Sequence, residues 1–120
     1  MKKLKIFKKE FERWRSFFSV DYYSVYFELE KTDDFYAKVY TQINERIATV
    51  VVNDKWLKSN KTKKEDISQV AFHEAFEVAL AELVPYTLDK DQTEVSKIFH
   101  NIINLFENKA FKILNKEINK

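Results

Sequence analysis

A long apolar segment that carries ionisable side chains is the strongest constraint on how this chain can fold. Residues 67–85 are mostly apolar and rich in alanine, which favours a single helix. His73 and Glu77 are four residues apart, so a helix places them one turn apart on the same face. That face should point inward, because it also carries the apolar residues Val70, Leu80, Ala81 and Val84. Burying a charge without a partner is costly, so a metal ion shared by His73 and Glu77 would explain the pattern.

Two other segments have the apolar spacing of amphipathic helices. They cover residues 4–18 and about 92–116, and charged residues lie between their apolar positions. The alanine-rich helix should begin near Thr62 or Asp66, either of which could cap it, and should stop at Pro85. Three helices are therefore expected, the second of which carries the metal motif.

Three segments between the first two helices are predicted to be strands. Residues 22–30 and 35–42 alternate between the two faces, and residues 45–53 are rich in β-branched side chains. Short turns at residues 32–34 and 43–45 predict an antiparallel meander. The sequence therefore predicts one α+β domain over residues 1–120, with an N-terminal helix, a three-stranded antiparallel sheet, the metal-motif helix and a C-terminal helix.

The composition excludes several classes of function. With no cysteine, the chain has neither disulfides nor thiolate ligands, so any metal must be held by His, Asp or Glu. With no glycine, it has no Walker or dinucleotide-binding phosphate loop. A net charge of +2 gives no reason to expect a nucleic-acid partner. No apolar run reaches the roughly 18–20 residues of a membrane span, and the basic start lacks an apolar signal core, so we expect a cytoplasmic protein with no membrane partner.

Both histidines of the chain fit one candidate metal centre. A catalytic zinc ion takes three protein ligands and keeps one position open for water. His73 and Glu77 supply two ligands, and an antiparallel neighbouring helix could bring His100 alongside them as the third. Glu74 would then lie near the open position and accept a proton from the water. Glu94, earlier on the last helix, is an alternative third ligand.

Other interpretations of the same residues stay open at the level of the sequence. His73 could be a hydrogen-bonded core histidine with Glu77 as its partner, because His-Glu pairs are common on helices. Two histidines and a carboxylate also form the facial triad of iron oxygenases, although the helical setting argues against such a site.

The chain resembles a family of small phage-borne proteins described as zincin-like metallopeptidases. The resemblance covers roughly residues 4–112 and is sharpest around the two helical motifs. It runs through residues 11–14, 19–23, 35–39, 46–50, 52–56, 70–78 and 100–108. In the pattern of that family His73 matches the first metal ligand, Glu74 the general base and Glu77 the second ligand, where histidine is commoner. His100 stands where the family often has Glu-His-Arg, and here Phe99 precedes it.

This resemblance implies a minimal zincin fold, a Zn²⁺ cofactor and hydrolysis of a peptide bond by a metal-activated water with Glu74 as general base. An extended peptide or protein substrate would pair with an exposed sheet edge, for which residues 46–53 are the candidate. The alternative is a catalytically inactive zincin-like protein that binds a host or phage protein, for example part of a host defence system. A phage origin would place the protein in the host cell cytoplasm.

Overall fold

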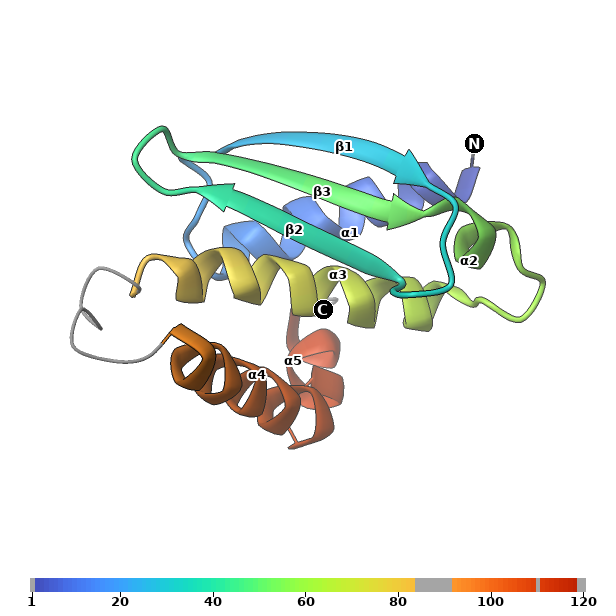
Figure 1. Ribbon diagram of the computed structural model, residues 1–120. Coiled ribbons are helices and arrows are strands. Elements are labelled where there is room, and N and C mark those ends of the chain that lie inside the picture. The colour runs from blue at the N-terminus through green and yellow to red at the C-terminus, as the bar shows by residue number, and fades with distance from the viewer. Residues whose placement is uncertain (1, 84–91, 110, 119–120) are drawn as a thin grey trace.

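The computed structural model describes residues 2–83, 92–109 and 111–118. The described elements are α1 (Lys2–Phe17), β1 (Ser24–Glu30), β2 (Ala37–Gln42), β3 (Ile47–Asn53), α2 (Asp54–Lys58), α3 (Lys64–Ala81), α4 (Gln92–Lys109) and α5 (Phe111–Ile118). The α+β class, the N-terminal helix, the three strands and the later helices are as expected. Figure 1 shows the sheet over α1 and α3, with α4 and α5 on the opposite side of α3.

The sheet is mixed, so the prediction of an antiparallel meander is wrong. Its strand order is β1-β3-β2, with β1 parallel and β2 antiparallel to β3. The central strand β3 is buried or half-buried at every residue, whereas exposed and half-buried residues alternate in β2 and in the first part of β1. The predicted turn at residues 32–34 is therefore part of a crossing from one edge of the sheet to the other.

Asn53 at the end of β3 holds this crossing in place. Its side-chain amide donates to the carbonyls of Thr32 and Phe35 at 2.7 and 2.9 Å, and its backbone N–H donates to the Tyr36 carbonyl. Its side-chain oxygen accepts from the Lys55 N–H and so caps α2. One buried asparagine thus donates hydrogen bonds to the carbonyls of the crossing loop and caps the next helix.

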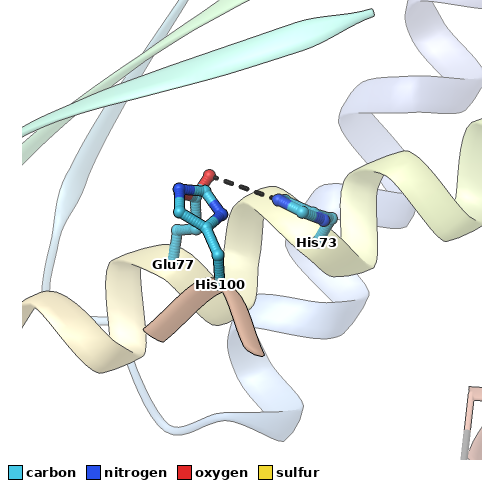
Figure 2. A group of neighbouring side chains, drawn as sticks. All are labelled: His73, Glu77 and His100. Atoms are coloured by element: carbon cyan, nitrogen blue, oxygen red, sulfur yellow. Dashed lines mark ion pairs between the residues drawn. The ribbon is translucent and has the colours of Figure 1, made fainter. Parts of the chain in front are cut away.

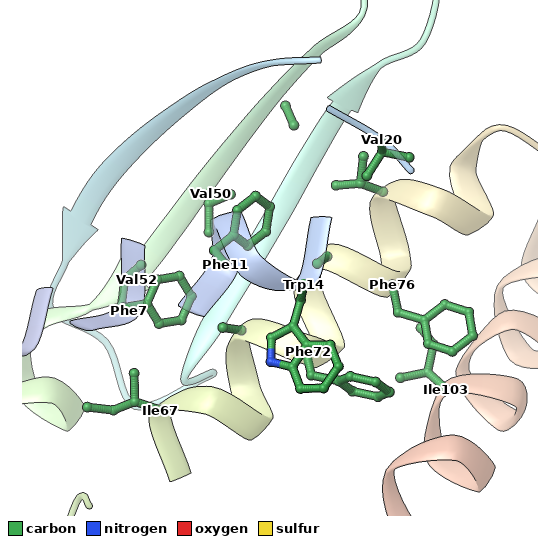
Figure 3. Close-up of a cluster of buried hydrophobic side chains, with 14 of the residues drawn as sticks. Phe7, Phe11, Trp14, Val20, Val50, Val52, Ile67, Phe72, Phe76 and Ile103 are labelled. Atoms are coloured by element: carbon green, nitrogen blue, oxygen red, sulfur yellow. The ribbon is translucent and has the colours of Figure 1, made fainter. Parts of the chain in front are cut away.

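An aromatic core joins the sheet to the helices. Phe7, Phe11 and Trp14 lie on one face of α1 and are fully buried, and the Trp14 ring packs edge-on against Phe72 of α3 with ring centroids 4.9 Å apart (Figure 3). Burying an aromatic side chain of this size stabilises a fold by about 2–3 kcal/mol. This packing fixes one side of α3 and leaves its opposite side, with His73, for the site.

The ends of the helices differ from the sequence-based expectations. α3 begins at Lys64; Asp66 accepts a hydrogen bond from the Lys63 N–H, whereas the Thr62 hydroxyl donates to the Trp56 carbonyl. The expected stop at Pro85 lies outside the described residues.

The expected last helix is divided into α4 and α5. Phe111, the first residue of α5, packs on Trp14 and Phe72, with ring centroids 5.7 and 5.3 Å away.

Candidate metal centre

α3 presents His73 and Glu77 together, as their spacing predicts. The His73 Nε2 atom lies 3.7 Å from the Glu77 Oε2 atom, one helical turn away. About a quarter of each side chain is exposed, so the pair lies at a surface cleft and not inside the core. The face of α3 that was predicted to point inward is therefore only partly buried at His73 and Glu77.

α4 brings the second histidine to the same place. The His100 Nε2 atom lies 3.8 Å from the Glu77 Oε1 atom, so Glu77 points one oxygen at each histidine. One ligand atom from each of His73, Glu77 and His100 lies within 4.8 Å of the other two, which is close enough to hold a metal ion. Figure 2 shows the three side chains converging from the two helices. Among the described residues this group contains His100 and not Glu94.

The donor set fits a divalent transition metal. Two imidazole nitrogens and a carboxylate oxygen are ordinary ligands of zinc, and three protein ligands leave a fourth position free. Tetrahedral zinc with ligand bonds of about 2.0–2.1 Å separates its ligand atoms by roughly 3.4 Å. One ligand atom from each of the three residues lies within 4.8 Å of the other two, so the side chains would have to move closer together to bind zinc in this geometry.

Glu74 lies next to this group in an unusual environment. Only 3% of the residue is exposed, and its Oε2 atom has no hydrogen-bond partner within the described structure. Burial, the charge of Glu77, a hydrogen bond to Glu77 and the charge of Glu107 all raise the pKa of Glu74 well above its ordinary value. A buried carboxyl with a raised pKa and an unpartnered oxygen is a candidate for proton transfer.

Glu107 is the residue of this site that the sequence interpretation missed. Its Oε1 atom contacts the Nδ1 atom of His73, and its Oε2 atom accepts a hydrogen bond from Gln69 at 3.3 Å. Burial lowers the pKa of His73, but the hydrogen bond and charge of Glu107 and the charge of Glu77 together raise it. Glu107 follows His100 by seven residues, two helical turns, so its position on the same face was a usable signal.

Two clefts lie along the same side of β2. The larger cleft, of about 620 Å³, is lined by residues that include Tyr36, Ala37, Trp56, His73, Glu74 and Glu107. The smaller cleft, of about 190 Å³, is lined by residues that include Val39, Thr41, Glu77 and His100. The metal group therefore stands where the two clefts adjoin.

The edge strand beside these clefts is β2. Residues 46–53 were the expected edge, but Ile47–Asn53 form the central strand β3 and already pair on both sides, so that expectation is wrong. Val39 and Thr41 of β2 point toward α3, as their place in the cleft lining requires. Among the described strands, β1 and β2 have a free edge with which an extended ligand could pair, and β2 is the one next to the metal group.

Fold and site together define an α+β protein with a His-Glu-His group that could hold a metal ion. Comparison of the chain with protein-family models, with curated proteins and with solved structures gives no match. No helix in the described part of the chain is long and apolar enough to span a membrane. The function must therefore be inferred from the chain's own residues.

Proposed function

We propose that this chain is a zincin-like metalloprotein that binds Zn²⁺ through His73, Glu77 and His100 and hydrolyses peptide bonds. The observation that carries the proposal is the convergence of three ligand atoms within 4.8 Å beside the buried Glu74. A single His-Glu contact would be an ordinary helix pair, but two helices here contribute to one group at the border of a cleft.

Each residue of the group has a defined role in this proposal. A bound zinc ion would supply a Lewis acid that polarises a peptide carbonyl and acidifies a water molecule. Glu74 would accept the water proton at Oε2, the atom without a partner, and return it to the leaving amine. Burial and the neighbouring carboxylates raise the pKa of Glu74, which makes its carboxylate a stronger proton acceptor than an exposed carboxylate.

The clefts and the sheet edge support an extended peptide or protein as the substrate. A peptide strand can add to a free sheet edge through backbone hydrogen bonds while alternate side chains enter pockets. β2 offers such an edge, and its side chains Ala37, Val39 and Thr41 line the two clefts on either side of the metal group. The scissile bond would then lie near Val39, opposite Glu77.

The test is cleavage of an unbiased peptide library by zinc-loaded protein, with Glu74→Gln and Glu45→Gln in parallel. Removal of a general base typically lowers the rate by about a hundred- to ten-thousandfold. Glu74→Gln should therefore bind zinc but lose nearly all cleavage. Glu45 is exposed in the turn before β3, so its variant should cleave as the parent does. Equal cleavage by parent and Glu74→Gln would refute the assigned base.

One observation favours a second candidate, a zincin-like protein without turnover that binds a host or phage protein. Glu74 is 3% exposed and its carboxyl hydrogen-bonds to Glu77, which limits its access to a substrate water. The metal content of the purified protein separates the candidates, because a metal-free, folded protein with no cleavage supports the binding role. A phage origin, a location in the host cytoplasm and a target in a host defence system rest on the family resemblance and belong to this proposal.

A further inference from the structure

His73 directs its two ring nitrogens toward different partners. Nδ1 contacts the Glu107 carboxylate of α4, whereas Nε2 lies 3.7 Å from Glu77 on the side of the metal group. The second oxygen of Glu107 accepts from the Gln69 amide, one turn before His73 on α3. Gln69, Glu107 and His73 thus form a chain of contacts between the two helices, along one wall of the larger cleft.

We propose that Glu107 is a positioning residue that fixes His73 in the tautomer with its proton on Nδ1, which leaves the Nε2 lone pair free for the metal. An ionised carboxylate can only accept hydrogen bonds, so the contact requires a hydrogen on Nδ1. Neutral imidazole carries a single N–H, so Nε2 must then be unprotonated. The inference rests on the proposed function for its purpose, but the tautomer is a property of the metal-free chain.

The surroundings of Glu107 favour a lasting contact. Side-chain exposure is 16% for Glu107 and 25% for His73, so water competes weakly for the shared hydrogen bond. Gln69 holds the far oxygen of Glu107 and so limits rotation of the carboxylate. Carboxylates that hold a ligating histidine in this way typically change metal affinity by about 10- to 100-fold when they are removed.

The first arm of the test reads the tautomer directly. The chain has two histidines, so long-range ¹H–¹⁵N spectra of metal-stripped protein contain two ring systems, and His100→Gln assigns them. At about pH 9, above the ordinary histidine pKa of about 6.5, His73 should show a protonated Nδ1 and an unprotonated Nε2. Glu107→Gln should keep this pattern, because its amide oxygen still accepts, whereas Glu107→Met should lose it. A parent His73 with its proton on Nε2, or an unchanged pattern in Glu107→Met, would overturn the inference.

The second arm measures binding of Zn²⁺ alone by competition with a chromophoric chelator. Glu107→Met should weaken binding by about 10- to 100-fold, Glu107→Gln should weaken it less, and the distant Glu45→Gln should not change it. Parent-like affinity of Glu107→Met would show that Glu107 does not position His73. A parent protein that binds no Zn²⁺ would refute the proposed metal site, and the tautomer of the metal-free chain would still decide the role of Glu107.

Discussion

Replacing Glu74 by glutamine should stabilise the metal-free protein, although the same change should abolish cleavage. Glu74 is 3% exposed, its Oε2 atom lacks a partner, and the carboxylates of Glu77 and Glu107 lie nearby. Glutamine has nearly the same shape, carries no charge and can donate its amide hydrogens to Glu77. The variant therefore removes an unfavourable interaction without leaving a cavity.

The expected magnitude depends on pH, and its sign follows from the raised pKa. The pKa of Glu74 is raised in the folded state, so its stabilising contribution is fully present below about pH 4.5 and declines as the pH rises through the folded-state pKa. Burying the ionised Glu74 carboxylate costs at least as much as leaving a neutral polar group unsatisfied, which is about 1–3 kcal/mol. Glu74→Gln should therefore gain about 1–3 kcal/mol over the parent at pH 8 and little near pH 4.5. At roughly 4 °C per kcal/mol for a chain of this size, the melting temperature should rise by about 4–12 °C at pH 8.

Urea unfolding measures the difference in free energy of unfolding between Glu74→Gln and the parent. The measurements are made with a chelator at pH values from 5 to 8, about the range in which many small domains are most stable. Glu45→Gln is the matched control, because the same chemical change at an exposed turn should stay within about 0.5 kcal/mol of the parent. A Glu74→Gln variant that is no more stable than the parent at pH 8 would refute the assigned environment of Glu74. An advantage that does not grow with pH would show that the pKa of Glu74 is not raised.

Two further predictions concern zinc and a buried tyrosine. Zinc at 100 times its dissociation constant should stabilise the folded chain by about 2.7 kcal/mol, and His73→Ala should abolish this gain; an unchanged melting temperature after chelation of zinc-containing protein would contradict it. The Tyr23 hydroxyl donates a hydrogen bond to Glu82 at 2.6 Å. Burial raises the pKa of Tyr23, and this hydrogen bond and the charge of Glu82 raise it further. The Tyr23 contribution to stability is then present below about pH 10 and lost above it. Tyr23→Phe should lower the free energy of unfolding by about 0.5–1.5 kcal/mol at pH 7 and by less at alkaline pH. An ultraviolet titration in which Tyr23 ionises below pH 10 would contradict the raised pKa.

The sequence was sufficient to predict α1, the three strands and α3, but not the short helix α2 or the pairing of the strands. Alternation of apolar and polar residues and runs of β-branched residues predicted β1, β2 and β3, because burial of a strand face determines which of its positions are apolar. The crossing between the sheet edges is held by Asn53, whose side-chain amide donates hydrogen bonds to two loop carbonyls far away in the sequence. Such a long-range hydrogen bond has no periodic signal, and the polar residues of the loop resemble those of a hairpin turn.

The candidate site shows the same division between local and long-range information. The spacing of His73 and Glu77 follows from helical geometry, and His100 joins them once α4 packs beside α3. The contact of Glu107 with His73 depends on the rotation of α4 about its own axis, which packing of buried residues such as Ile103 sets. The sequence shows which residues share a face of α4, but the depth and rotation of that face come only from three-dimensional packing.

The parallel pairing of β1 with β3 sets the order in which the sheet can assemble during folding. β2 and β3 are joined by a short turn, so their hairpin needs little loop closure. Ser24 pairs with Ile47, so β1 must close a loop that contains all of β2 before it can join β3. We expect the hairpin to form early and β1 to dock late, so that substitutions in β2 slow folding and those in β1 mainly hasten unfolding. The strand that borders the clefts would then belong to the folding nucleus, and the strand at the far edge would close the sheet last.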